Sequence, residues 1–303
     1  MNERFHPIGT PGQPWGPAEV QAWRAGLTKR RSHAQDVVAA VDALRSRYDV
    51  SEYGALHYDG ERFPLLAVRS RDWRDELPVL VVTGGVHGYE TSGVLGALQY
   101  LREHGHETAG RANLLVVPCV SPWAYERIQR WNFDALDPNR NFREGSPAGE
   151  SAALVALLAP LRGRVLVHID LHETTDTDET EFRPALAARD GKPYVPGEIQ
   201  DGFYLVDDAD HPQPAFQRAV IDAVARVTHI AAPDANGQII DSPLQSPGVI
   251  EFPVSRSALC AAITGARFAT TTEVYPDSPR TTPQECIAAQ VTAVRAAVEF
   301  ALR

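Results

Sequence analysis

The spacing of apolar residues alternates along the chain between the interval typical of helices and the interval typical of strands. Positions 17–48 repeat apolar residues at helical intervals, with a break near 31–33, and predict one or two helices. Shorter alternating or continuous apolar runs predict strands at 53–58, 63–70, 79–83, 113–117, 165–171 and 268–275. Further helices are expected at 91–104, 148–159, 214–227 and from Thr282, which begins a capping box with Glu285.

This order of elements predicts one α/β domain over residues 17–303, with a mixed or parallel central sheet flanked by helices. Residues 1–16 are rich in Pro and Gly and are expected to form an irregular N-terminal arm. The segment 173–260 carries Pro and Gly together with apolar residues, so we interpret it as insertions in the same domain. In such folds the carboxyl ends of the strands carry the ligands.

Composition narrows the class of protein. The net charge of −10 argues against nucleic acid or an anionic membrane surface as the main partner. Cys119, Cys260 and Cys286 form no closely spaced pair, which is typical of a reducing compartment. The N-terminus lacks the apolar stretch of a secretory signal, and no apolar run reaches the ~20 residues that span a bilayer. We therefore expect a cytoplasmic protein; its oligomeric state is not indicated.

The first candidate for chemistry lies where the predicted strand 79–83 meets the next helix. A glycine-rich turn there delivers His87 and Glu90, three residues apart. Such a pair can close on one divalent metal, because the turn brings both side chains to the same side of the chain. A solvated His and a Glu that complements the helix dipole would show the same spacing.

The strand 165–171 supplies a second candidate. Its alternation places His168, Asp170 and His172 on the face opposite its apolar residues. Burying this polar row without partners would cost several kcal/mol, so the row is either exposed or part of a site. His172, at the strand end, suits a metal ligand, and the two deeper residues suit hydrogen-bonding partners. Together with His87 and Glu90 it would complete the two imidazoles and one carboxylate of a catalytic zinc site, whose natural reaction is hydrolysis of an amide or ester.

Four elements in a fixed order resemble the zinc carboxypeptidase family. They are the His87/Glu90 pair, the Asp-Pro-Asn-Arg-Asn-Phe motif at 137–142, His172 closing a strand, and Glu273 on a late strand. The resemblance extends over positions 79–275. It implies a single catalytic domain with a mixed, mostly parallel sheet flanked by helices, and one Zn²⁺ ion.

The resemblance also implies roles for residues of the motif. Asn139 and Arg140 would hold the terminal carboxylate of the substrate, and a guanidinium suits this because it binds a carboxylate through two hydrogen bonds. Asp137 would accept a hydrogen bond from the ligand His87 and fix its tautomer.

Two further roles follow from the same family. An arginine upstream of the motif would stabilise the oxyanion; Arg130 is the best match and Arg127 is its rival, while a solvated helix face would explain either. Glu273 would be the general base, and in that role its pKa should be moved toward neutrality by burial. A surface strand Glu in a salt bridge is the alternative.

Two departures from the family leave the substrate open. Residues 248–266 contain no Tyr, where digestive carboxypeptidases have a mobile one, and 169–175 look more like the aspartoacylase and succinylglutamate desuccinylase branch. We therefore expect a metallocarboxypeptidase acting on peptide C-termini, with an N-acyl-amino-acid deacylase as the alternative. A non-catalytic metal-binding protein is a third reading, although a pure binder would not need Glu273. The acidic run 176–181 could rim the site or be a solvated loop.

Overall fold

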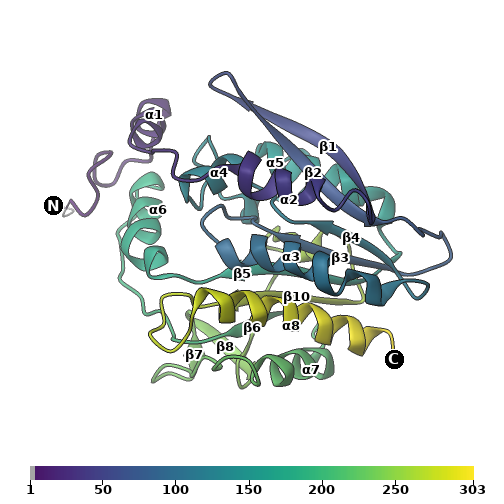
Figure 1. The fold of residues 1–303 in the computed structure, drawn as a ribbon. Helices are drawn as coiled ribbons and strands as arrows, with labels where there is room; N and C mark the ends of the chain where they lie inside the picture. The colour runs from purple at the N-terminus through teal and green to yellow at the C-terminus, as the bar shows by residue number, and fades with distance from the viewer. Residues whose placement is uncertain (1–3) are drawn as a thin grey trace.

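The computed structural model describes residues 4–303 and contains a ten-stranded sheet with the order β1-β2-β4-β3-β5-β10-β6-β9-β8-β7 (Figure 1). The strands are β1 (Tyr48–Tyr58), β2 (Glu61–Ser70), β3 (Val79–Gly84), β4 (Asn113–Val117), β5 (Val165–Glu173), β6 (Tyr204–Asp208), β7 (Gln238–Ile239), β8 (Ser242–Ser246), β9 (Val249–Phe252) and β10 (Phe268–Val274). The α-helices are α1 (Pro17–Ala25), α2 (Ala39–Asp42), α3 (Thr91–Glu103), α4 (Pro122–Arg127), α5 (Gly149–Leu158), α6 (Arg183–Arg189), α7 (Pro214–Val224) and α8 (Pro283–Ala301). Short 3₁₀ or π segments are η1 (Ala34–Val38), η2 (Gly105–Thr108), η3 (Pro138–Arg140), η4 (Ala159–Leu161), η5 (Asp178–Phe182) and η6 (Cys260–Ala262).

The predicted mixed sheet is confirmed, but it is not mostly parallel. Parallel pairing joins β4 to β3, β3 to β5, β5 to β10, and β6 to β9. The remaining pairs are antiparallel, and they include the β1–β2 hairpin and the edge formed by β7, β8 and β9. Connections that contain helices lie between the strands of the parallel pairs, whereas short turns join β1 to β2, β7 to β8 and β8 to β9.

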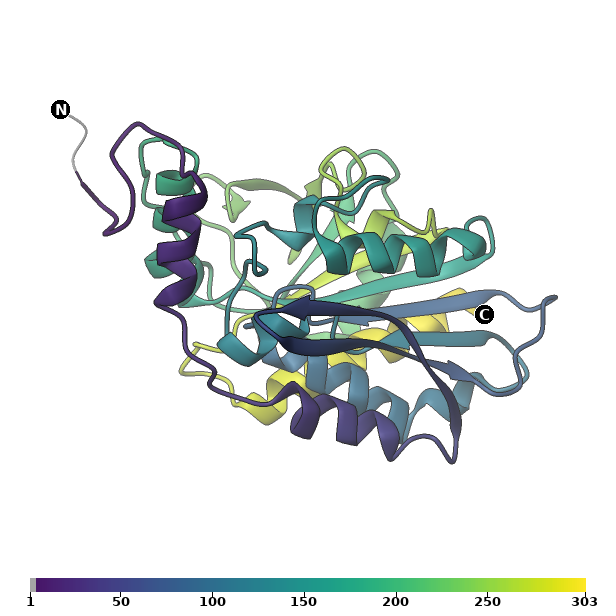
Figure 2. The same cartoon turned by 90° about the horizontal axis from the view of Figure 1, so that it is seen from above.

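Helices cover both faces of the sheet. Side chains of α2, α3, α7 and α8 share one core with the sheet, and this core includes Val167, Ile169 and Leu171 of β5. On the other face, Leu154 and Leu158 of α5 pack with Val79 and Val81 of β3 (Figures 1 and 2). The predicted alternation of β5 is therefore confirmed, since its apolar side chains enter the first core and its polar row lies on the opposite side.

Local signals in the sequence explain several element boundaries. The hairpin turns at Asp59 and Gly60, both with positive φ, as the Asp-Gly pair predicts. The Thr282 side chain accepts a hydrogen bond from the N–H of Glu285 and caps α8. Beside the sheet, α1 and α6 pack against each other through Trp23 and Ala185 (Figure 2).

The segment 173–260, which we interpreted from its sequence as insertions in the same domain, contributes strands to the central sheet. It supplies β6, which pairs with β10, and the strands β9, β8 and β7, which extend the sheet beyond it. The sequence signal was weak because β7 and β8 are short and β8 contains Pro243. Such strands are tolerated at an edge, where one side of the backbone needs no partner.

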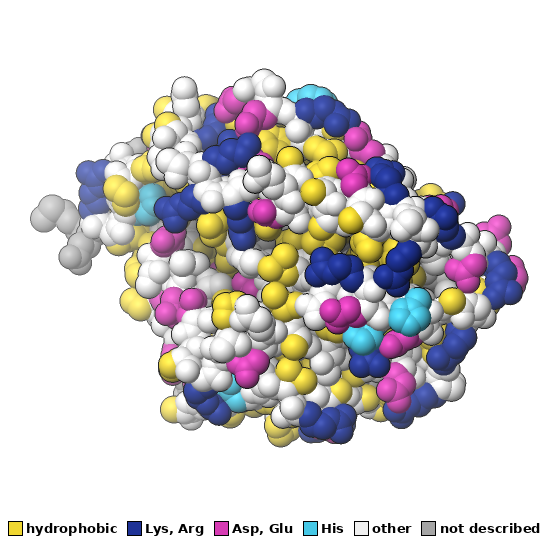
Figure 3. Space-filling view, in the orientation of Figure 1, with side chains coloured by type: hydrophobic (Ala, Val, Ile, Leu, Met, Phe, Trp, Pro, Cys, Tyr) yellow, Lys and Arg dark blue, Asp and Glu magenta, His cyan; other side chains and the backbone are white. Residues whose placement is uncertain are grey.

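Within residues 4–303, none of the helices combines the length and the apolar character needed to cross a membrane. Figure 3 shows basic and acidic side chains interspersed over one face of the molecule.

Candidate metal centre and active site

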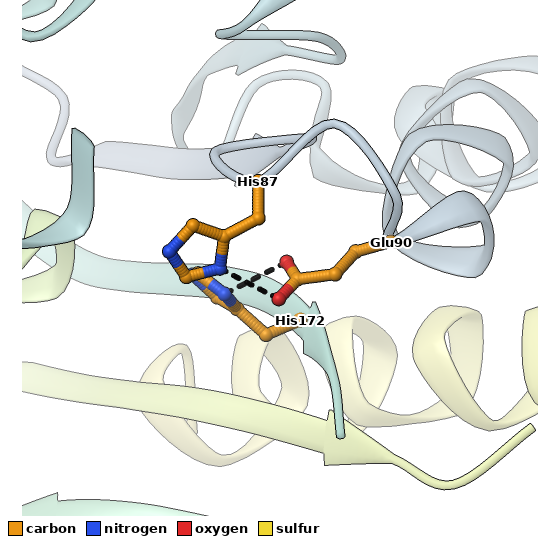
Figure 4. A group of neighbouring side chains, drawn as sticks. All are labelled: His87, Glu90 and His172. Carbon is orange, nitrogen blue, oxygen red and sulfur yellow. Dashed lines mark hydrogen bonds and ion pairs between the residues drawn. The ribbon is translucent and has the colours of Figure 1, made fainter. Parts of the chain in front are cut away.

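His87, Glu90 and His172 meet at the carboxyl ends of β3 and β5. One ligand atom from each residue lies within 4.8 Å of the others, and each residue is only 1% exposed. His87 comes from the turn after β3, Glu90 directly precedes α3, and His172 is near the end of β5 (Figure 4). The structure thus brings together the three residues that the sequence predicts as metal ligands.

The glycines of the turn are required by its geometry. Gly85 has a φ of 60°, in the left-handed region that favours glycine. A Cβ atom on Gly88 would lie 2.0 Å from the carbonyl carbon of Ala124, so no larger residue fits against α4. Because the turn packs closely against α4, the His87 side chain points toward Glu90 and His172.

The outer nitrogens of both imidazoles face carboxylates. His87 Nε2 lies 3.0 Å from Asp137 Oδ1, and His172 Nε2 lies 2.6 Å from Asp170 Oδ2. A carboxylate accepts but does not donate, so in a neutral imidazole a proton on Nε2 satisfies this contact and leaves the lone pair on Nδ1. Asp137 thus contacts His87 as predicted, and Asp170 does the same for His172.

Both Nδ1 atoms point at Glu90. His87 Nδ1 is 2.7 Å from Oε1 and His172 Nδ1 is 2.8 Å from Oε2 (Figure 4). Lone pairs and carboxylate oxygens at these distances repel, so the three side chains need either protons on the Nδ1 atoms or a cation among them. Burial favours the neutral acid, but the positive charge of protonated His172 and His87 outweighs it and lowers the pKa of Glu90 to about 2, so the carboxylate stays ionised. The donor set fits a divalent cation.

A second hydrogen-bond network, deeper in the sheet, holds Asp170 in place. Thr83 of β3, its register partner across the sheet, donates a hydrogen bond of 2.6 Å to Asp170 Oδ1. His168 lies beside the same hydroxyl, 3.2 Å away, and also contacts Thr264. Burial lowers the pKa of His168 to about 4. The deeper part of the polar row is therefore a satisfied hydrogen-bond network that supports His172.

Arg130 and Arg127 lie in different environments. Arg130 donates to Asp137 through Nε (3.1 Å) and to Asp178 and Tyr89 through Nη1 (3.2 and 2.8 Å). Its Nη2 has no hydrogen-bond partner among residues 4–303. Arg127 instead pairs with Glu61 and stacks on Trp123, away from this network.

Glu273 lies next to the candidate metal ligands. In the parallel pairing of β5 and β10 it is the register partner of His172, so the two side chains leave the same face of the sheet. Thr174 donates a hydrogen bond of 2.9 Å to its carboxylate, and the Tyr204 hydroxyl lies 2.8 Å from that of Thr174. Burial raises the pKa of Glu273 to about 7.

A cavity of about 220 Å³ opens beside these residues. Its lining includes His87, Glu273, Arg130, Asn139 and Arg140. The Arg140 guanidinium forms no ion pair with any described carboxylate, and its one hydrogen bond to a described residue is to the Asn139 carbonyl. The Asn139 amide oxygen is already occupied by the Cys260 N–H at 2.8 Å, which leaves its NH₂ group as the available donor. An unpaired guanidinium in such a cavity suits an anionic ligand.

Several residues of the site were not predicted. Tyr204 of β6 and Phe252 of β9 line the cavity. Phe252 belongs to the segment 248–266, which contains no Tyr. Asp178 joins the Arg130 network, so the acidic run 176–181 does reach the rim of the site. Its contact with Arg130 is set by the tertiary fold, and the charge of the run alone could not reveal it.

Solved structures share this architecture. A candidate metallopeptidase from Shewanella amazonensis matches with a TM-score of 0.65 and 20% identity, over 90% of this chain and 98% of that one. A metallo-carboxypeptidase from Burkholderia cenocepacia matches with a TM-score of 0.59 and 12% identity, over 95% and 69%. The chain has the metallo-carboxypeptidase fold.

A third structure with the metallo-carboxypeptidase fold is the enzyme from Pseudomonas aeruginosa, solved in complex with (2-guanidinoethylmercapto)succinic acid. It matches with a TM-score of 0.56 and 16% identity, over 89% of this chain and 69% of that one. Neither the protein-family models nor the curated protein sequences match the chain. The fold that the resemblance implied is confirmed by these likenesses in structure.

Proposed function

We propose that the protein is a zinc-dependent hydrolase that cleaves the amide bond next to a free carboxylate, acting as a carboxypeptidase on peptide C-termini. One observation carries the proposal: His87, whose Nδ1 converges with that of His172 on Glu90, lines the same cavity as Glu273 and the unpaired Arg140. A cation site, a base and an anion site then lie within the reach of one small substrate.

The donor set favours zinc. Two imidazoles and one carboxylate are the ligands of catalytic zinc sites, whereas Mg²⁺ and Ca²⁺ prefer oxygen donors. Bound there, zinc would supply a Lewis acid that polarises a carbonyl and lowers the pKa of water.

The remaining chemistry belongs to side chains of this chain. Glu273, with a pKa of about 7, can accept a proton from water and pass it to the leaving amine. The free Nη2 of Arg130 is the donor available to the oxygen of the scissile carbonyl as negative charge develops on it. Asp137 and Asp178 hold that guanidinium in place, so little reorganisation is needed.

Arg140, with the Asn139 NH₂ group, would bind the terminal carboxylate. The ligand in the Pseudomonas aeruginosa structure is a substituted succinic acid, so at least one protein of this fold accepts a ligand with carboxylates. This supports an anion site in the cavity of the present chain. The size of that cavity, about 220 Å³, suits a single amino-acid residue rather than a long segment.

An N-acyl-amino-acid deacylase would use the same residues. The sequence 169–175 favours this second function, because it resembles the deacylase branch. Rates on peptides and on N-acyl amino acids with the same terminal residue separate the two functions.

The proposal is tested by blocking the substrate carboxylate. A substrate with a free C-terminus should be hydrolysed, and its amidated form should react at least ~100-fold more slowly, since an unpaired charge is left behind. Arg140→Gln should abolish that discrimination, whereas Arg143→Gln, at an exposed position nearby, should retain it. Equal rates on both substrates with wild-type protein would contradict the proposal.

A further inference from the structure

A second cavity, of about 380 Å³, adjoins the first. Arg130, Asp178 and Phe182 line both cavities, so they form the wall between them. Arg140 and Glu273 line only the first cavity. The second cavity therefore lies on the far side of Arg130 from the anion site.

The positions of the two cavities set the orientation of a bound substrate. With the substrate carboxylate at Arg140 and the scissile carbonyl at Arg130, the acyl group of the substrate extends past Arg130. We propose that the second cavity is the binding site for this acyl-side group and that it takes an uncharged, apolar group, with aromatic groups preferred. The inference rests on the proposed function, because that function sets the position of the scissile bond.

The chemistry of the second cavity supports an apolar occupant. Trp23, Leu27 and Trp131 contribute apolar surface to its lining. Trp131 meets Trp23 and Phe182 edge-on, with ring centroids 5.5 and 5.6 Å away, so the wall is built in the geometry that aromatic groups favour. An aromatic ligand would extend this cluster.

The charges of the second cavity disfavour an anionic acyl group. Its one arginine, Arg130, is already paired with Asp137 and Asp178. Glu181, on the rim, is exposed and has no ion-pair partner within residues 4–303. A succinyl group would meet the negative charge of Glu181 there, and no unpaired arginine or lysine among residues 4–303 lines this cavity to balance it, which should weaken its binding. A neutral group avoids this repulsion.

Ile128 is a further sign that the second cavity is built for an apolar contact. It ends α4 with a φ of 56°, a conformation that costs a β-branched residue roughly 1–2 kcal/mol, and glycine or asparagine is usual there. Its side chain nevertheless lines the cavity, and 38% of the residue is exposed. Packing against a bound apolar group would give this strained and exposed side chain a function.

The test compares acyl groups on one amino acid, using the zinc-loaded full chain. N-benzoyl, N-acetyl and N-succinyl forms present the same carboxylate and scissile bond. We expect kcat/KM to be roughly 10-fold or more higher for benzoyl than for acetyl, from burial of the ring, and lowest for succinyl. Ile128→Asn should reduce the benzoyl-to-acetyl ratio at least ~3-fold while leaving thermal stability unchanged or higher, because Asn tolerates positive φ. Val195→Asn, at an exposed position outside both cavities, should leave the ratio unchanged.

The outcomes separate this inference from the proposed function. Hydrolysis with a ratio near one, or a ratio that Ile128→Asn does not change, overturns the acyl-side site and leaves the hydrolase proposal standing. If none of the three compounds is hydrolysed, the proposed function fails, and the acyl-side site is tested by measuring the binding of the compounds instead. Calorimetry on the Glu273→Gln variant should then show that the benzoyl compound binds more tightly than the acetyl compound. Adding Ile128→Asn should remove this difference. Equal binding of the two compounds to the Glu273→Gln variant would overturn the acyl-side site.

Discussion

The carboxylate of Glu173 accepts hydrogen bonds from the backbone N–H groups of Ser92 and Thr91, at 2.6 and 3.1 Å. Glu173 follows the candidate ligand His172, and α3 begins directly after the candidate ligand Glu90. A single carboxylate therefore links the end of β5 to the first turn of α3, where it satisfies helix N–H groups that have no partner within the helix. This contact fixes the spacing between two of the three candidate metal ligands.

Replacing Glu173 tests the link. Glu173→Gln keeps the shape but offers only one acceptor oxygen, so one buried N–H loses its partner, and stability should fall by roughly 1–3 kcal/mol. Zinc affinity should fall as well, because Glu90 and His172 lose their common restraint. Urea denaturation and zinc titration measure the two effects.

The matched control for Glu173 is Glu299→Gln. Glu299 is an exposed carboxylate on α8 that pairs with Arg303, so it tests the same change of charge without the buried acceptors. It should leave zinc affinity unchanged. Unaltered zinc affinity in Glu173→Gln would refute the restraint.

Asp170 is predicted to orient His172 toward the metal. Asp170→Asn can present an NH₂ group to Nε2 in place of an oxygen, which disfavours the tautomer that leaves Nδ1 free. Zinc affinity should drop about 10- to 100-fold. Asp75→Asn, at a fully solvated side chain, serves as the control and should bind zinc like the wild type. The proposed tautomer is wrong if both variants bind equally well.

Activity should fall as the pH decreases through the pKa of Glu273. The base must be deprotonated to accept a proton, and burial raises its pKa to about 7, while a bound cation would draw it back toward the ordinary value of about 4.3. The acid limb of kcat/KM should therefore lie between these two values. A rate that stays constant from pH 4 to pH 8 would remove Glu273 from the role of base.

Glu150 should make the fold less stable at high pH. It is buried in the first turn of α5, and burial raises its pKa to about 7, so the folded state prefers the neutral acid. Its contribution is fully present below about pH 4.3 and is lost as the pH rises toward 7, by up to about 3 kcal/mol. Denaturation of wild type and Glu150→Gln over this range should give curves that diverge as the pH rises. Glu144→Gln, at an exposed position, should follow the wild type, and parallel curves for Glu150→Gln would contradict the buried neutral acid.

The convergence of His87, Glu90 and His172 was predictable because their signals are local. His87 and Glu90 are three residues apart on one turn, and the period of two along β5 separated His172 from the core. Predicting that Glu273 lies near these residues required the family resemblance as well, because neither strand sequence alone indicates that β10 pairs with β5.

The surroundings of the site were less predictable because they depend on tertiary contacts. Arg127 and Arg130 differ in environment because Ile128 turns the chain at the end of α4, and a β-branched residue gives no signal for such a turn. Tyr204 reaches the site only because β6 pairs with β10, and the polar sequence around β6 did not predict a strand. Side chains brought together by strand register across ~70 residues leave no periodic pattern to detect.

The central claim is zinc-dependent hydrolysis with Glu273 as the base. The most direct measurement is the rate of C-terminal amide hydrolysis by wild type and by Glu273→Gln at equal, measured zinc content. We predict one zinc per chain in both proteins and a rate roughly 10²–10⁴-fold lower in the variant. A protein that takes up no zinc, or a variant that hydrolyses as fast as the wild type, would contradict the account.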